Sequence, residues 1–385
     1  MRLNKALSTV GLTALALGCA TGLASADTVK QLEERIAKLE SRASAQKGTI
    51  STATGADLTF YGYARADAYK DMDYDLGSNN IGFGALTEAS PKNGKFGAHA
   101  YQTRLGIRGS FEDVKFNVEG DFYGTNGAFR LRQAYGEYAG FTIGQAWSNW
   151  NSDANPSAMV DFNGVPGGAG YRAVQLRYTV KATDKVAFSF SIEDDPAAYK
   201  ARPILTGAMR YTEGTTNVKL ALASRQIENL QGEDVSAWGG SIGVNAAPWE
   251  GGALSGFVFM GEGVSGLVNF SNGVGQQAGG ATVRGSYDLD INGDTIGIKG
   301  YGFSLNQVVA PKVELGLSYG RYDYDNFAGS VGGSTKSLDA GIISAKYKPT
   351  SNTLFALEYM KLNKKFFNGN KVSADRVLAV AQYSF

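Results

Sequence analysis

Apolar and polar side chains alternate along most of the chain from residue 58 onward. Leu58 and Phe60 share one face of the first such stretch, whereas Tyr61 and Arg65 share the other. The same period of two returns from residue 114, where polar residues occupy every second position up to Asp121. This period predicts β-strands with one apolar and one polar face. A soluble β-sandwich shows the same alternation, so a single stretch leaves both folds open.

The repetition of these stretches decides between the two folds. We predict the following strands: 58–68, 100–111, 114–123, 129–139, 141–149, 171–180, 185–193, 206–213, 217–226, 236–246, 253–262, 294–305, 312–324, 337–348, 353–363 and 374–385. Sixteen is an even number, as a closed bacterial outer-membrane barrel requires, and strands of about ten residues suit such a barrel. Ala281–Leu289 also alternates, but we assign it to a loop because counting it makes the total odd. We therefore predict an all-β fold, a transmembrane antiparallel β-barrel of about 16 strands over residues 58–385.

The connections and the chain end fit this barrel. We expect the short connections to be periplasmic and the long ones extracellular. The short ones are 112–113, 139–140 and 349–352, and the long ones are 69–99, 150–170, 263–293 and 325–336. The last strand alternates up to a terminal aromatic residue, Phe385. This ending is similar to the signal read by the barrel-assembly machinery of the outer membrane, so we predict that Phe385 engages it.

The N-terminus reads as an export signal. Arg2 and Lys5 precede an apolar stretch, and Ala24-Ser25-Ala26 fits a signal-peptide cleavage site, which predicts a signal peptide over residues 1–26. Ala16 to Cys19 offers a rival lipoprotein cleavage box, although the alanine three residues before the cysteine fits it poorly. The sequence has no other apolar run near the roughly 18 residues that a spanning helix needs.

Residues 27–43 form a short heptad pattern. Val29, Leu32, Ile36 and Leu39 step by three, four and three residues, as the a and d positions of a coiled coil do. Arg35 and Glu40 fit the arginine and glutamate of short trimeric coiled coils, so we predict a trimer stalk made of these six residues. An amphipathic helix lying on its own barrel, or plugging it, is the alternative. Residues 44–57 are predicted to be a flexible linker.

The amino-acid composition limits the kinds of functional site that the chain can form. The 51 Gly, 20 Tyr and 20 Phe suit strands, turns and aromatic girdles. Charged residues make up 19 % of the chain, below the about 25 % usual for soluble proteins. The only cysteine, Cys19, lies in the predicted leader, and His99 is the only histidine. We therefore predict no metal site, no cofactor and no enzymatic activity.

Arginines recur on the polar faces of the predicted strands. A charge on the lipid face costs about 2–4 kcal/mol at the membrane midplane, so we expect these side chains to point into the lumen. The predicted pore-lining, substrate-binding residues are Arg65, Arg104, Arg108, Arg130, Arg132, Arg177 and Arg210. A guanidinium is always charged and matches carboxylate and phosphate geometry. The alternative is that each arginine only braces the wall by pairing with acids such as Asp67, Glu119 and Asp121.

One region carries a family resemblance. Residues 129–138, with the following 144–148, 161–164, Arg172 and 176–179, are similar to the DcaP-like family of trimeric outer-membrane porins. The likeness is concentrated in residues 100–180, while residues 200–335 show barrel character alone. The resemblance implies an N-terminal coiled coil, a 16-stranded barrel and transport of dicarboxylates and other small organic anions. It also implies that Arg104, Arg130, Arg132 and Arg177 lie at or near the constriction.

The loop after the fifth predicted strand is a candidate constriction loop, because in general porins this loop folds inward. Its candidate residues are Trp147, Trp150, Asp153, Asp161 and Asn163. A surface loop is the alternative reading.

Together these features predict a homotrimeric porin in the outer membrane of a Gram-negative bacterium, in contact with membrane lipid and lipopolysaccharide. We expect passive uptake of small anionic solutes such as dicarboxylates. Three alternatives stay open: a non-selective or cation-tolerant porin using its luminal acids, an outer-membrane phospholipase or protease using His99, and a structural or adhesive barrel. The glycine-rich runs precede no helix pattern, so they predict turns and not phosphate cradles, and no nucleic-acid site is expected.

Overall fold

The structure is a computed structural model that describes residues 49–51, 55–79, 81–154, 158–168, 170–195, 202–229, 231–270 and 288–385. The predicted signal peptide, the linker up to residue 48 and the stalk residues Val29, Leu32, Arg35, Ile36, Leu39 and Glu40 lie outside the described residues. The chain divides into two compact units, residues 1–51 and 52–385. Of the first unit the structure describes a short strand, β1 (Thr49–Ser51).

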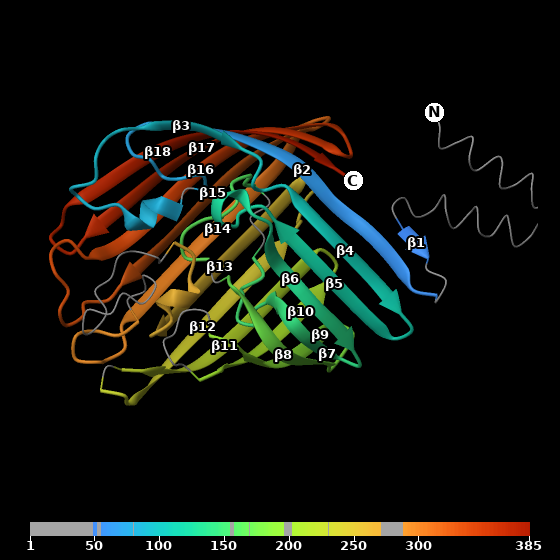
Figure 1. The fold of residues 1–385 in the computed structure, drawn as a ribbon, viewed down its shortest axis with the longest axis horizontal. Helices are drawn as coiled ribbons and strands as arrows, with labels where there is room; N and C mark the ends of the chain where they lie inside the picture. Colours follow the sequence, from blue (N-terminus) through green and yellow to red (C-terminus); the bar gives the residue numbers. More distant parts are fainter. Residues whose placement is uncertain are drawn as a thin grey trace, which may run out of the picture. The chain divides into compact units, whose positions relative to one another are not determined.

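The second unit is an antiparallel β-barrel (Figure 1). Its strands are β2 (Asp57–Asp71), β3 (Lys95–His99), β4 (Arg104–Phe111), β5 (Val114–Asp121), β6 (Arg130–Tyr138), β7 (Phe141–Trp147), β8 (Arg172–Lys181), β9 (Val186–Glu193), β10 (Ile204–Glu213), β11 (Thr216–Glu228), β12 (Asp234–Ala246), β13 (Gly252–Glu262), β14 (Gly297–Ala310), β15 (Val313–Tyr324), β16 (Thr335–Thr350), β17 (Thr353–Phe366) and β18 (Lys371–Ser384). The short 3-10 helices are η1 (Ile81–Ala85), η2 (Thr125–Gly127) and η3 (Ser265–Leu267). No helix among the described residues is long and apolar enough to cross a membrane.

The barrel closes between its last and first long strands. β18 pairs with β2 from Arg376 opposite Asp71 to Ser384 opposite Tyr63. The terminal residue extends this pairing, because the backbone N–H of Phe385 donates to the carbonyl of Gly62 at 3.1 Å. β3 and β4 pair with different parts of β2, so together they occupy one strand position in the barrel. The described residues therefore form the closed 16-stranded all-β barrel that the alternation predicts, and this prediction is confirmed.

The two faces of the wall differ as the period of two requires. Apolar side chains on the outer face are exposed, among them Phe60, Leu105, Val118, Leu131 and Val174. Polar and charged side chains on the inner face are buried, among them Arg65, Asp67, Asn117, Glu119 and Gln175. An apolar outer face is the surface that a lipid bilayer accepts, because lipid cannot solvate charge.

The predicted strand 100–111 begins at Arg104 in the structure, because residues 100–103 form a turn between β4 and the short strand β3, which lies in the predicted loop 69–99. The turn between β3 and β4 places Thr103 where a ladder pair would otherwise form. Its hydroxyl accepts a hydrogen bond from the N–H of Arg65 at 3.0 Å and donates to the carbonyl of Arg65 at 3.2 Å. The side chain thus replaces the missing backbone partners of β2, so the interruption leaves no backbone group of Arg65 unpaired.

β6 contains an extra residue. Glu119 pairs with Gln133, and the next residue of β5, Gly120, pairs with Leu131, so Arg132 has no partner of its own. This β-bulge shifts the alternation by one residue, because bulges re-aim side chains. It explains why Arg130 and Arg132 share the polar face with the odd-numbered Tyr135 and Glu137 farther along the strand.

Candidate functional site

The segment between β7 and β8 lies against the inner wall of the barrel, as its hydrogen bonds to widely separated strands show (Figure 1). On β12, the side-chain amide of Asn245 donates to the carbonyl of Asp153 at 2.8 Å. On β17, Glu358 accepts from the backbone N–H of Val160 at 2.7 Å. The segment therefore contacts the inner faces of both β12 and β17, and its role as a constriction loop stays a prediction.

Glycines on the inner wall make room for this segment. A Cβ atom at Gly243 of β12 would overlap the carbonyl of Ser152, and one at Gly316 of β15 would overlap the carbonyl of Ala158. The indole of Trp150 is fully buried beside Phe259 of β13, with ring centroids 6.4 Å apart. The segment therefore packs closely on this wall, and any side chain at these two glycines would push it away.

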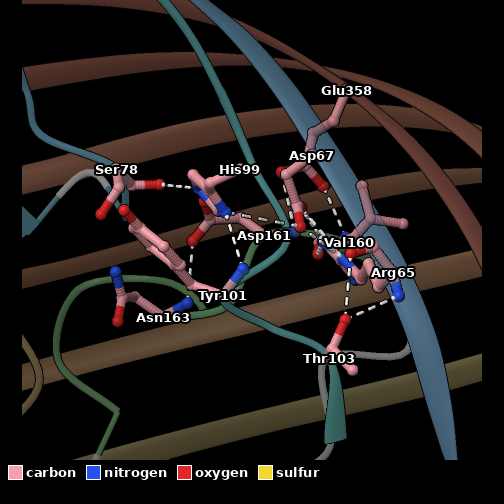
Figure 2. Close-up of polar contacts among 10 residues, drawn as sticks. All are labelled: Arg65, Asp67, Ser78, His99, Tyr101, Thr103, Val160, Asp161, Asn163 and Glu358. Atoms are coloured by element: carbon pink, nitrogen blue, oxygen red, sulfur yellow. Dashed lines mark hydrogen bonds and ion pairs between the residues drawn. The ribbon is translucent and has the colours of Figure 1, made fainter. Parts of the chain in front are cut away.

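A network of polar contacts holds the middle of the segment to β2 and β17 (Figure 2). Arg65 of β2 pairs with Asp67 at 2.6 Å and donates to the carbonyl of Val160 at 2.7 Å. Glu358 accepts from the N–H of Val160 and from that of Asp161 at 3.2 Å. Arg65 is thus a brace between the wall and the segment, with its charge neutralised by Asp67.

The single histidine belongs to the rim of this network. The Nδ1 atom of His99 accepts from the N–H of Tyr101 at 3.3 Å, so its Nε2–H donates to the carbonyl of Ser78 at 2.8 Å (Figure 2). Asp67 lies 4.0 Å from Nδ1. Both ring nitrogens of a neutral His99 are occupied in positioning loop backbone, which is a structural arrangement and not that of a nucleophile's base.

A cavity of about 1190 Å³ borders the segment. Among the described residues that line it, seven are basic and three are acidic. The basic residues are Arg65, Arg104, Arg130, Arg132, Arg172, Lys346 and Lys348, and the acidic ones are Asp153, Asp161 and Glu314. We call this space cavity 1; its wall carries an excess of positive charge.

The arginines of β6 share the carboxylate of Asp121, and Arg132 also binds Glu119. Arg130 makes two hydrogen bonds to Asp121, at 2.9 and 2.8 Å. Arg132 binds Glu119 and Asp121, both at 2.9 Å. Both guanidinium groups also lie over the ring of Phe162, at 5.7 and 5.3 Å from its centroid. The bulge at Arg132 brings both arginines to Asp121, so they brace the wall and face cavity 1 together.

Two further arginines give this group more cations than acids. Arg104 stands 3.6 Å from Glu119, with its guanidinium over Tyr63. Arg172 lies over the ring of Trp147 at 5.2 Å, and its Nη1 has no hydrogen-bond partner in the described part of the chain. Four guanidinium groups thus lie around two carboxylates, so positive charge exceeds negative charge in this group. Sequence reasoning included Arg172 in the family motif but missed it as a site residue, because it lies at the very start of β8, out of step with Arg177.

Three of the remaining predicted residues, Arg108, Arg177 and Arg210, lie outside cavity 1, whereas Asn163 lines it. Arg177 and Arg210 line a second cavity of about 500 Å³, cavity 2. Arg210 forms an ion pair with Asp153 of the loop segment. Asn163 contacts the carbonyl of Asn79 through its side-chain amide. Arg108 is exposed, lies over the Tyr61 ring at 5.4 Å and lines neither cavity.

Burial affects the loop carboxyl of Asp161. It lies deep in the barrel, although it keeps access to the water of cavity 1, and this burial raises its pKa to about 6. The hydrogen bond from the N–H of Asn163 and the charges of Arg376 and Arg65 act in the opposite direction, whereas Asp67 adds to the rise. Burial therefore favours the uncharged form of Asp161 more than for an exposed aspartate.

The closed barrel, its apolar outer face and its basic inner cavity define an outer-membrane channel of the porin class. The family model of the DcaP outer membrane protein matches residues 28–216, so this part of the chain is similar to that family. The match and the barrel place the chain in the outer membrane of a Gram-negative bacterium. No curated protein matches the chain.

Solved structures share the fold. The outer membrane channel DcaP of Acinetobacter baumannii superimposes with a TM-score of 0.77 at 23 % identity, covering 88 % of this chain and 100 % of that one. The anion-selective porin from Comamonas acidovorans gives 0.57 at 15 % identity, covering 86 % and 100 %. OmpF of Salmonella typhi gives 0.58 at 13 % identity, covering 88 % and 100 %. At these identities the likeness concerns the fold.

Proposed function

We propose that this channel passes small anions, dicarboxylates among them, in preference to cations. The observation that carries the proposal is the excess of arginine around cavity 1, where the buried Nη1 of Arg172 has no hydrogen-bond partner among the described residues. The acids of this region, Glu119 and Asp121, are occupied by Arg130 and Arg132. A cation beside Glu119 or Asp121 would therefore meet a neutralised carboxylate, whereas an anion there meets the guanidinium groups of Arg104 and Arg172. This argues against the cation-tolerant alternative.

The energetics suit transport better than tight binding. The cavity is open to water, so the effective dielectric constant is high and one ionic contact contributes about 1 kcal/mol. Several weak contacts in sequence attract an anion and still release it. A dicarboxylate gains more than chloride, because each carboxylate fits the planar donor pair of one guanidinium.

The test is the reversal potential in a salt gradient across a planar bilayer. We expect an anion-selective potential for the natural chain, and a shift toward cations in Arg172→Gln. Arg108→Gln is the matched control, because it removes the same charge from an exposed arginine that lines neither cavity. A cation-selective natural channel, or equal shifts in both variants, would contradict the proposal.

We also propose a homotrimer. The heptad pattern of residues 27–43 and the family resemblance support it, and one solved neighbour, OmpT of Vibrio cholerae, is described in a trimer form. Native mass measurement in mild detergent should give three copies. Deletion of residues 27–54 should leave a folded barrel, because the closing β2–β18 pairs begin beyond it. A monomeric natural chain contradicts this proposal.

A further inference from the structure

Resting on the proposed function, we infer that cavity 2 is a second, separate anion site in the same channel. Its ligand class is small carboxylates, and Asp153 of the loop segment acts as a built-in carboxylate that an arriving anion displaces. The site is formed by Arg177 of β8, Arg210 of β10 and Lys219 of β11, all of which line cavity 2.

The register places two of these cations face to face. Arg210 and Lys219 are directly opposite each other across the β10–β11 ladder. Like charges in this position repel, so the pair needs a counter-ion. Asp153 supplies it, with Lys219 Nζ 3.1 Å from one carboxylate oxygen and Arg210 bound to the other. Lys219 is 3 % exposed, so the wall shields it and leaves the carboxylate as its ionic partner.

Arg177 is the third cation, and it has no ion pair in the described residues. The charges of Glu193, Arg210, Glu137 and Asp153 act on it. The nearby Glu193 is engaged elsewhere, because it accepts hydrogen bonds from the N–H of Asn149 and the hydroxyl of Tyr171. Five basic and two acidic described residues line cavity 2, the acids being Asp113 and Glu137. The charge balance of the cavity therefore favours an anion.

Asp153 stands between the two cavities. It lines cavity 1, whereas its partners Arg210 and Lys219 line cavity 2. Its backbone has a φ of 58° and is fixed by the hydrogen bond from Asn245. The backbone can therefore stay in place while the side chain leaves its cations. An anion that moves from cavity 1 toward cavity 2 can take over those cations, so neither cation is left unpaired during the exchange.

The experiment measures the block of chloride current by succinate in planar bilayers. In Asp153→Asn the competing carboxylate is gone and the left-handed backbone is still tolerated, because asparagine accepts positive φ. We expect the block to strengthen about fivefold, the factor that corresponds to about 1 kcal/mol for one solvated ionic contact. Adding Arg177→Gln to this variant should remove the gain. Glu314→Gln is the matched control, because it removes an acid that lines cavity 1 and pairs with Lys348 instead.

The outcomes separate this inference from the proposed function. An equal gain in Glu314→Gln, or a gain that survives Arg177→Gln, would overturn the second site. If Asp153→Asn does not assemble, Arg177→Gln alone must weaken the block in the natural chain, and an unchanged block overturns the inference. Failure of the proposed function shows instead as a cation-selective reversal potential. If the potential is cation-selective but succinate still blocks Asp153→Asn more strongly than the natural chain, the second site stands without the proposed function. If succinate blocks neither chain, the second site is overturned.

Discussion

The carboxylate of Glu358 in β17 accepts a hydrogen bond of 2.7 Å from the backbone N–H of Val160, 198 residues earlier in the chain. The same carboxylate accepts from the N–H of Asp161, while Arg65 donates to the carbonyl of Val160. The middle of the loop segment is therefore held through its backbone. Since such contacts do not depend on the loop side chains, two residues of the wall fix the middle of the loop whatever side chains it carries there.

Glu358→Gln should loosen this attachment. A carboxylate offers two acceptor oxygens, whereas an amide offers one oxygen and turns a donor toward the other N–H. Leaving one buried N–H unpaired costs about 1–3 kcal/mol. We expect larger current fluctuations in single-channel recordings, with barrel assembly retained. Glu213→Gln serves as the control because Glu213 is exposed on β10; similar fluctuations in both variants would show that the attachment is not what steadies the loop.

The pKa of Asp161 predicts a pH dependence of the same attachment. An unfolded aspartate titrates near 3.8, and burial raises the pKa of Asp161 to about 6. The folded protein therefore holds this proton more tightly, so the folded loop gains stability as the pH falls from about 6 to about 4 and loses it as the pH rises through that window. Neutral Asp161 also no longer repels the nearby Asp67.

Single-channel fluctuations recorded between pH 7 and pH 5 measure this effect. We expect them to decrease on acidification in the natural chain. Asp161→Asn should show equally small current fluctuations at both pH values, because residue 161 then carries no charge that acidification could remove. A pH response of unchanged size in Asp161→Asn would assign the titration to another group.

Removal of Phe385 should reduce surface levels more than conductance. The residue pairs with Gly62 through backbone hydrogen bonds of 3.1 and 3.3 Å, and its side chain is 55 % exposed. Its absence shortens the closing ladder by one pair, and we further predict the loss of a contact to the barrel-assembly machinery. Phe385→Tyr keeps an aromatic end and the pairing, so it should assemble normally. Quantifying surface-exposed protein tests this, and normal levels of the truncated chain would refute it.

Local alternation was sufficient to locate the strands. The prediction of 353–363 and 374–385 lies within three residues of β17 and β18 at each end. The period of two is a property of neighbouring residues, so it is legible without the fold. The contact between Glu358 and Val160 cannot be predicted in this way, because neighbouring residues do not indicate which strand of the barrel wall a loop will contact.

The arginine group was predictable in part for the same reason. Parity alone assigns Arg104 and Arg177 to the polar face, but it cannot detect the bulge at Arg132. It also passed over Arg172, whose position at the end of a strand depends on its contact with Trp147. The roles of these residues in selectivity stay predictions.

Arg130 and Arg132 provide the decisive variant for selectivity. Because both bind Asp121, their joint replacement by alanine removes two positive charges and releases that carboxylate and Glu119 to the cavity. We expect the reversal potential to shift strongly toward cations and the block by small dicarboxylates to disappear. The released carboxylates add negative charge to the cavity, which the loss of an exposed arginine does not do. The shift in reversal potential for each positive charge removed should therefore be larger in the double replacement than in Arg108→Gln.

The same pair changed to lysine tests the geometry separately from the charge. Two ammonium groups keep the charge balance with Asp121 and Glu119, so anion preference should remain. The planar donor fork is lost, so dicarboxylate block should weaken. Equal assembly of all variants, checked by their yield in detergent, ensures that the currents report on the pore. If the alanine pair retains both selectivity and block, Arg130 and Arg132 are braces of the wall, and the anion preference must reside in Arg104, Arg172 and the cations of cavity 2.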